Sequence, residues 1–201
     1  MFQYDVIIIG AGVAGLYAAM KLPKEKKVLI INKRQPFKCN TFYAQGGVAL
    51  AKDKADVPVH IQDTLAAGDG LCDEEAVAVL SQFSREAIDD LIKNGFEFDK
   101  DDEGNLLYTR EAAHSCKRIL HAGGDATGRY LHHFLLSQNP HAMLSDARVV
   151  DLLIKEGVCY GVTVLEHRKS YNLYAKDVII ASGGVGSLYE YHTNAPCISA
   201  D

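Results

Sequence analysis

The apolar positions near the N-terminus follow the pattern of a βαβ unit. A continuous apolar run at residues 6–9 is followed by small residues and then by a helical pattern over residues 13–22. A second strand pattern, "KVLIIN", covers residues 27–32 and has an apolar centre. Unbroken apolar runs are typical of strands that are buried on both faces, as in a parallel sheet. The order of strand, glycine-rich turn, helix and strand therefore predicts a βαβ unit.

The middle of the chain contains one irregular stretch and one strong helical signal. Residues 36–72 are rich in glycine and alanine, and we predict irregular structure there. Apolar residues recur at helical spacing over residues 74–93, after Asp73 as a capping residue and before the Asn-Gly stop at 94–95. The residues that follow, 96–109, predict a hairpin around the turn "DDEGN".

The last third of the chain predicts a helix and an antiparallel meander. The helix follows the Thr-Gly pair at 127–128 and runs through Leu136, and strand patterns then cover residues 147–154, 158–166 and 171–181. We therefore expect an α/β fold, a Rossmann-like domain with a parallel sheet, helices and an antiparallel β-meander. We expect one domain over residues 1–201.

Composition and charge narrow the classes of function. The chain is 48% hydrophobic and 23% charged, which is the balance of a soluble globular protein. Its net charge of −5 and the lack of basic clusters argue against a nucleic-acid partner. The apolar runs are shorter than the roughly 20 residues of a membrane span. The five cysteines form no CxxC pair, so we expect reduced thiols, a cytoplasmic location and no metal site.

The turn after the first strand, "GAGVAG" at residues 10–15, has the spacing of a dinucleotide-binding loop. Gly10 permits the tight turn, Gly12 lets the backbone approach a pyrophosphate, and Gly15 lets the helix pack closely on the sheet. A turn without a ligand is the alternative, but the flanking strands and helix favour a phosphate site. The acid expected about 20 residues later is replaced by Asn32 and Lys33, so NAD is less well supported.

Six motifs occur in order along the chain: "DVIIIGAGVAGLYAA", "NTFYAQGGVA", "DTLAAGDGLCD", "TREAAHS", "RILHAGGDATGR" and "ASGGVGSLYEYHTN". Together these motifs resemble the L-aspartate oxidases, flavoproteins of the succinate dehydrogenase and fumarate reductase superfamily. The resemblance extends over essentially the whole chain. It implies an FAD-binding domain, with a capping domain and further catalytic residues that would follow residue 201.

The resemblance implies that FAD lies against the glycine-rich turn and the loop "NTFYAQGGVA". Asn40 stands where the respiratory members carry the histidine that bonds covalently to the flavin, so the FAD is expected to be non-covalent. Core packing is the expected role of Phe42 and Tyr43. The expected cofactor contacts are Gly10, Ala11, Gly12, Val13, Ala14, Gly15, Asn32, Lys33, Asn40, Thr41, Phe42, Tyr43, Ala44, Gln45, Gly46, Gly47, Val150, Ser182, Gly183 and Asp201.

On the substrate side, the resemblance singles out Glu111 and His114 as the catalytic candidates. L-aspartate differs from succinate by one ammonium group, which a carboxylate at Glu111 would attract. The alternative is that Glu111 only pairs with Arg110 or Arg118 on the surface. His114 is expected either to hydrogen-bond a substrate carboxylate or the flavin, or to serve only as a capped loop histidine.

The resemblance implies oxidation of L-aspartate to iminoaspartate, with O2 or fumarate as electron acceptor and hydrogen peroxide formed from O2. The product would enter NAD biosynthesis, where a quinolinate synthase is an expected partner. We expect the chain alone to bind FAD weakly and to turn over no substrate. The alternatives are a succinate dehydrogenase or fumarate reductase flavoprotein subunit, and a non-catalytic FAD-binding remnant.

Overall fold

The computed structural model describes residues 2–195 and 198–199 and divides the chain into two compact units. The first unit combines residues 1–43 with residues 131–201, and the second covers residues 44–130. That both units belong to one functional domain over residues 1–201 stays a prediction.

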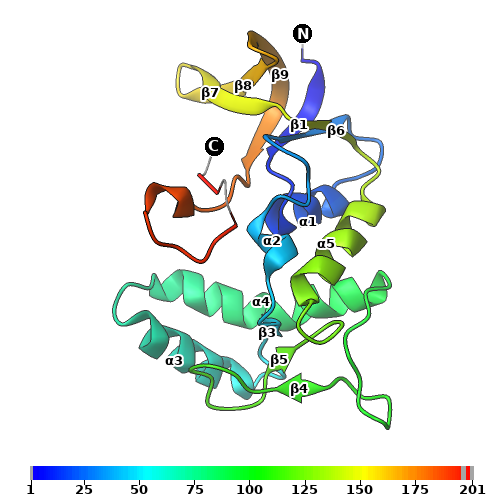
Figure 1. Cartoon of the computed structure of the whole chain (residues 1–201), viewed down its shortest axis with the longest axis vertical. Helices are drawn as coiled ribbons and strands as arrows, with labels where there is room; N and C mark the ends of the chain where they lie inside the picture. The colour runs from blue at the N-terminus through cyan, green and yellow to red at the C-terminus, as the bar shows by residue number, and fades with distance from the viewer. Residues whose placement is uncertain (1, 196–197, 200–201) are drawn as a thin grey trace. The chain divides into compact units, whose positions relative to one another are not determined.

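The first unit is built on a six-stranded sheet with the order β6-β2-β1-β9-β8-β7 (Figure 1). Its pairs β6·β2, β2·β1 and β1·β9 are parallel, whereas β9, β8 and β7 form an antiparallel meander. The predicted α/β fold with a parallel sheet and a β-meander is therefore confirmed. The strands are β1 (Tyr4–Ile9), β2 (Val28–Asn32), β6 (Ala142–Ser145), β7 (Arg148–Lys155), β8 (Val158–Glu166) and β9 (Lys169–Ile180).

The core of this unit lies on the faces of that sheet. Strand β1 is buried from Val6 to Ile9, and β2 is buried from Val28 to Ile31, as their unbroken apolar runs require. The meander contributes Val162 and Val164 to the same core. The helical elements of the unit are α1 (Val13–Lys21), α2 (Asn40–Tyr43), most of α5 (Thr127–Gln138) and the short 3-10 turn η1 (Gly186–Leu188).

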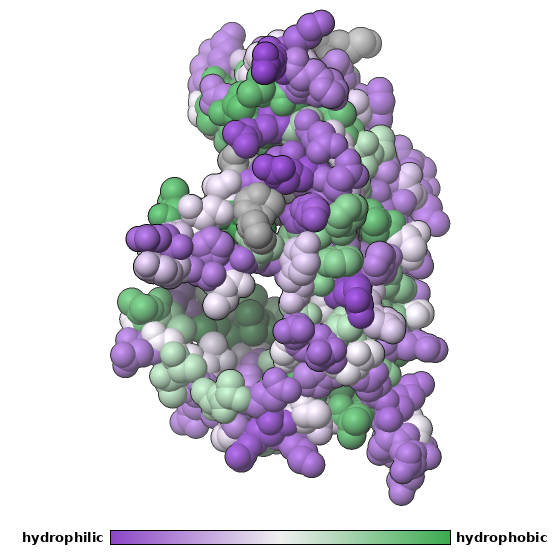
Figure 2. Space-filling view, viewed as in Figure 1, coloured by the Kyte–Doolittle hydropathy of each residue, from purple (hydrophilic) through white to green (hydrophobic). Residues whose placement is uncertain are grey.

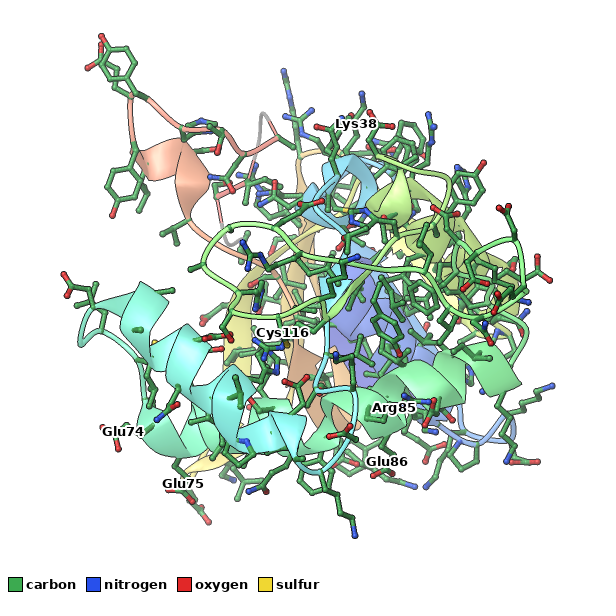
Figure 3. The ribbon with its side chains drawn as sticks, turned by 90° about the horizontal axis from the view of Figure 1, so that it is seen from below. Lys38, Glu74, Glu75, Arg85, Glu86 and Cys116 are labelled. Carbon is green, nitrogen blue, oxygen red and sulfur yellow. The ribbon has the colours of Figure 1, made fainter. Side chains whose placement is uncertain are left out.

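The second unit contains two longer helices and a small sheet. Helices α3 (Asp56–Gly68) and α4 (Glu74–Lys93) pack on each other, and strands β3 (Val48–Ala49), β5 (Ile119–Leu120) and β4 (Tyr108–Thr109) are antiparallel. Asp73 caps α4, because its carboxylate accepts the Ala76 N–H at 2.9 Å. Figure 3 labels Glu74 and Glu75 in the first turn of α4, where carboxylates favour the helix dipole.

The prediction of irregular structure over residues 36–72 is wrong, because α3 occupies much of that stretch. Its buried positions include Asp56 and His60, so the side facing the protein is partly polar and gives a weak apolar period. The predicted hairpin over residues 96–109 is reduced to one antiparallel bridge between Lys100 and Leu106. Tyr108 and Thr109 pair instead with β5.

The exposed apolar residues do not form one continuous band on the face that Figure 2 presents, which is mostly hydrophilic. Across residues 2–195 and 198–199, no helix has both the length and the apolar character that a membrane crossing requires. Leu71, Leu188 and Tyr191 are the most exposed large apolar side chains in the described residues.

Candidate functional site

A pocket in the first unit lies at the carboxyl ends of the parallel strands. Strands β1, β2, β6 and β9 end at Ile9, Asn32, Ser145 and Ile180, and the pocket is lined by residues at or just after these ends. Open α/β sheets bind ligands outside the carboxyl ends of their strands, at the point where the strand order reverses. The lining consists of residues 9–12, 31–34, 38–41, 147, 149, 181–184 and 198.

The three glycines of the turn have different reasons to lack a side chain. A methyl group on Gly10, which has φ +109°, would overlap the Ala181 carbonyl, and one on Gly15 would overlap the Gly10 carbonyl. Gly12 has ordinary dihedral angles, and its nearest obstacle would be Thr41 Oγ1 at 3.4 Å. Close packing therefore explains Gly10 and Gly15, whereas open space beside Gly12 is left for a ligand.

The Gly12 N–H, at the N-cap of α1, is a backbone donor on the wall of the pocket. The Val13 N–H donates to Thr41 Oγ1 at 3.0 Å. The Thr41 side chain, from α2, therefore caps the N-terminus of α1. The Gly12 N–H makes no hydrogen bond within the described residues. Val13 and Ala14 are exposed at the first turn of the helix. An unsatisfied N–H at a helix N-terminus is suited to an anion.

The polar rim of the pocket is partly engaged with the protein itself. Asn40 donates to Asn194 Oδ1 at 2.7 Å and accepts the Ala195 N–H at 3.0 Å. Asn32 donates to the Arg34 carbonyl, and Lys33 Nζ lies 2.6 Å from Ser199 Oγ. These side chains line the pocket, and their present contacts hold its wall. That they contact the cofactor stays a prediction.

Three cations, Lys33, Arg34 and Lys38, line the same pocket. Figure 3 labels Lys38, which comes from the segment just before α2. Clustered cations beside a free N–H are complementary to a phosphate group. The sequence predicts Lys33 as a cofactor contact, whereas Arg34 and Lys38 give no signal beyond their charge.

The later part of the chain also contributes to the pocket. Ser182 and Gly183 line it, and Gly183 has φ +83°. Ala147 and Val149 line it as well, whereas Val150 lines a neighbouring pocket and is half exposed. Asp201 lies outside the described residues.

The aromatic pair of the loop "NTFYAQGGVA" packs against protein. The Phe42 ring lies edge-on to His132 at 5.9 Å and to His133 at 5.6 Å, measured between ring centroids. Tyr43 contacts Phe42 edge-on and is 48% exposed. These contacts agree with the packing role expected for Phe42. The next two residues, Ala44 and Gln45, are exposed.

In the second unit, the Gly-Gly pair of this loop lies beside Glu111. Among the residues that the structure describes, a methyl group on Gly46 would have only Glu111 Oε2 nearby, at 4.0 Å. Gly47 has φ +77°, and a methyl group there would lie 2.9 Å from His121 Cε1 and would crowd β5. Gly47 is therefore required by packing, while Gly46 leaves open space next to the carboxylate.

Glu111 pairs with a histidine that the sequence analysis did not single out. Its Oε1 lies 3.1 Å from His121 Nε2, and Thr109 Oγ1 lies 2.9 Å from the same nitrogen. The side chain of Glu111 is 47% exposed, and that of His121 is 13% exposed. The expected alternative pairing with Arg118 is wrong, because Arg118 is buried against other carboxylates.

Arg118 is the centre of a buried polar cluster that joins α3 to the loop carrying Glu111 and His114. Its guanidinium pairs with Asp56 at 2.7 Å and with Asp63. Asp63 also accepts the Ser115 N–H and hydroxyl, each at 2.8 Å. Figure 3 labels Cys116, which belongs to this loop and donates to Asp56. The loop has no regular structure of its own, so these bonds determine its conformation.

The cluster is ionised at neutral pH. Hydrogen bonds from the Ser115 backbone and from Arg118 lower the pKa of Asp63 to about 2. Burial is the largest influence on Asp56 and raises its pKa, but the hydrogen bonds from Arg118, the Lys52 backbone and Cys116, with the charge of Arg118, together outweigh it and lower that pKa to about 2. Between these two carboxylates the pKa of Arg118 is raised. The carboxylates and the guanidinium therefore remain charged together.

Arg118 also determines how His114 presents its ring. The Arg118 Nη1 lies 3.2 Å from His114 Nδ1. A guanidinium only donates, so Nδ1 must accept and Nε2 must carry the proton. His114 can therefore offer an N–H donor to an anionic group.

The implied cofactor, FAD, fits the residues of the pocket. The open space at Gly12, its unsatisfied N–H and the three cations suit a pyrophosphate. A dinucleotide would also find the Asn32 and Ser182 side chains on the pocket wall. We therefore propose that FAD binds in this pocket, which we call the cofactor cradle.

Comparison with known proteins agrees with this interpretation. Residues 5–201 match the family described as the FAD binding domain. The L-aspartate oxidase of Clostridium acetobutylicum is 40% identical over 203 residues, which cover 99% of this chain and 46% of that protein. The L-aspartate oxidase of Bacillus subtilis is 36% identical over 205 residues, covering 100% of this chain and 39% of that protein. The chain spans less than half the length of these two relatives.

Among solved structures, the E. coli quinol fumarate reductase in a mutant form is similar with a TM-score of 0.88 and 28% sequence identity. The match covers 98% of this chain and 35% of that one. The relatives confirm the resemblance to the L-aspartate oxidases. Since the family model covers nearly the whole sequence, the chain belongs to the FAD binding domain family, and FAD is its cofactor.

Proposed function

We propose that this chain supplies the FAD-binding part of an enzyme that oxidises L-aspartate to iminoaspartate. The observation that carries the proposal is the position of Glu111, which lies beside Gly46 of the loop "NTFYAQGGVA" and is held by His121. The identity to L-aspartate oxidases supports the same reaction. When bound, FAD supplies the two-electron oxidant.

Glu111 acts in this proposal as the residue that selects the substrate. A carboxylate about 4 Å from the substrate's ammonium group gains about 1 kcal/mol in water and about 4 kcal/mol at an effective dielectric constant of 20. Glu111 is 47% exposed, so its contribution grows as water is excluded around the substrate. Succinate lacks the ammonium group and would leave the carboxylate without a partner.

His114 and His121 assist in different ways. His114, with Nδ1 occupied by Arg118, would donate from Nε2 to a substrate carboxylate. His121 orients the Glu111 carboxylate through its own Nε2. The buried cluster around Arg118 keeps the loop in place while the substrate enters and leaves.

The finer details follow the resemblance. O2 or fumarate would reoxidise the flavin, and a quinolinate synthase would consume the iminoaspartate in NAD biosynthesis. Four described cysteines are free thiols, which supports a reducing, cytoplasmic environment. Asn40 at the position of the respiratory enzymes' histidine supports a non-covalent flavin.

The decisive experiment measures hydrogen peroxide release by the whole protein with FAD, in the presence of L-aspartate or succinate. We expect release with L-aspartate and none with succinate. A test with fumarate under anaerobic conditions covers the case in which O2 is a poor acceptor. Turnover of succinate in place of L-aspartate would instead favour the succinate dehydrogenase or fumarate reductase alternative, and binding of FAD without any turnover would favour the non-catalytic one.

A further inference from the structure

A buried histidine contacts the dinucleotide-binding loop from a distant part of the chain. The His132 side chain on α5 is fully buried, and its Nε2 lies 3.0 Å from the Ala11 carbonyl oxygen. Ala11 is the residue between Gly10 and Gly12, and 121 positions separate it from His132. His132 itself does not line the pocket.

The protonation of this imidazole follows from its partner. A carbonyl oxygen only accepts, so Nε2 must carry the proton. Burial lowers the pKa of His132 more than the bond to Ala11 raises it, which keeps the ring neutral. The Pro36 backbone also raises the pKa of His132, to a smaller extent than Ala11 does. The Nδ1 atom makes no hydrogen bond within the described residues.

An unsatisfied buried nitrogen is unfavourable, so packing alone is a poor reason for a histidine here. A leucine would fill comparable space without that penalty. Phe42 packs edge-on against the ring at 5.9 Å and limits its rotation. The ring is thus held in the orientation in which Nε2 faces Ala11.

The bond to Ala11 has a consequence for Gly12. The Ala11–Gly12 peptide is trans, so its carbonyl and its N–H point in opposite directions. With the carbonyl held by His132, the Gly12 N–H must point to the other side of the peptide. That N–H makes no hydrogen bond within the described residues, and both Ala11 and Gly12 line the cradle.

We propose that His132 is a positioning residue for the cofactor, which fixes the Ala11–Gly12 peptide so that the Gly12 N–H is available to the FAD pyrophosphate. His132 acts through the backbone and makes no contact with the cofactor. The proposal rests on the FAD cradle alone. Loss of the proposed L-aspartate oxidation would leave it intact.

The test compares three variants of the chain by FAD titration, with quenching of flavin fluorescence as the readout. His132→Leu removes the donor and keeps an apolar side chain of similar reach. His132→Gln retains an N–H that can reach the Ala11 carbonyl. His133→Leu is the matched control, because His133 is exposed and also packs on Phe42.

We expect His132→Leu to raise the Kd for FAD about tenfold, or about 1.4 kcal/mol, and His132→Gln to recover most of the affinity. His133→Leu should bind like the unaltered chain. ADP, which carries the pyrophosphate without the flavin, should lose the same factor with His132→Leu when it competes for the site. Urea denaturation of the FAD-free proteins measures stability separately.

A purely structural histidine would lower stability and leave the Kd unchanged, and that result would overturn the proposal. Equal losses of affinity in the Leu and Gln variants would also overturn it. Should His132→Leu fail to fold, NMR of the unaltered chain provides the test, with a protonated His132 Nε2 and a Gly12 amide resonance that shifts on ADP addition expected. A Gly12 amide resonance whose chemical shift does not change on ADP addition would contradict the proposal, and so would the absence of any FAD binding.

Discussion

Alanine substitutions at Gly12 and Gly15 separate the needs of the cofactor from those of the fold. At Gly12 (φ −79°, ψ −173°) alanine is allowed, and its methyl would meet Thr41 Oγ1 at 3.4 Å. Reduced freedom of the unfolded chain contributes about 0.4–1 kcal/mol of stability. The poorer capping tendency of alanine costs about 0.5–1 kcal/mol. Gly12→Ala should therefore leave the free energy of unfolding within about 1 kcal/mol of its original value.

Gly15 gives the opposite result. Alanine improves helix propensity by about 1 kcal/mol, but its methyl would overlap the Gly10 carbonyl, which is backbone and cannot rotate away. Overpacking of this kind costs about 1–3 kcal/mol or more. We expect these two contributions to leave a net loss of up to about 2 kcal/mol in Gly15→Ala, and more if the overlap with the backbone costs more than the usual range.

FAD binding reverses the order of the two variants. The Gly12 methyl would occupy the space left for the pyrophosphate, so the Kd for FAD should rise by about tenfold or more in Gly12→Ala. Urea denaturation and FAD titration on the same preparations measure the two effects. The reasoning is refuted if Gly12→Ala binds FAD as tightly as the unaltered chain, or if it loses as much stability as Gly15→Ala.

Three further predictions concern other parts of the site. Asp56 and Asp63 have pKa values of about 2, below the ordinary value of 3.8, so they stabilise the fold above pH 4 and that stability is lost as the pH falls toward 2. Asp63→Asn should be less stable than the unaltered chain at neutral pH and should lose less stability on acidification. Acid unfolding of both proteins, measured by circular dichroism, tests this, and parallel unfolding curves would contradict it. Gly47→Ala should destabilise the chain more than Gly46→Ala in thermal unfolding, because only Gly47 has φ above zero and crowds His121; equal losses would count against the packing argument. Acid precipitation of the FAD-loaded protein should leave all flavin in the supernatant, because Asn40 cannot form the covalent bond of the respiratory enzymes' histidine. Flavin that remains in the pellet would contradict a non-covalent cofactor.

The sequence predicted the parts of the fold and site that depend on local patterns. The apolar runs of β1 and β2, with the glycine spacing and the helix between them, predict a phosphate site from sequence. Helix α3 escaped prediction because Asp56 and His60 occupy part of its buried face. From sequence alone, a polar residue is expected to be exposed. Asp56 is buried because it pairs with Arg118, which the sequence pattern does not show.

The contacts of the site residues depend on residues far apart in the chain. Arg118 meets Asp56 across 62 positions, and His132 meets Ala11 across 121 positions. His121 lies only ten positions after Glu111, yet antiparallel pairing between β4 and β5 brings it to the carboxylate. That pairing involves two-residue strands, which are too short to give an alternating pattern.

The most direct test of the proposed function is anaerobic reduction of the flavin in the whole protein. The readout is the loss of the visible absorbance of the flavin. This measurement needs no assumption about the electron acceptor. L-aspartate should bleach the flavin and succinate should not, and Glu111→Gln should reduce the advantage of L-aspartate by about tenfold or more, as expected for loss of a charge pair of about 1.4 kcal/mol or more. Bleaching by succinate at a rate equal to that with L-aspartate, or an unchanged preference in Glu111→Gln, would contradict the account.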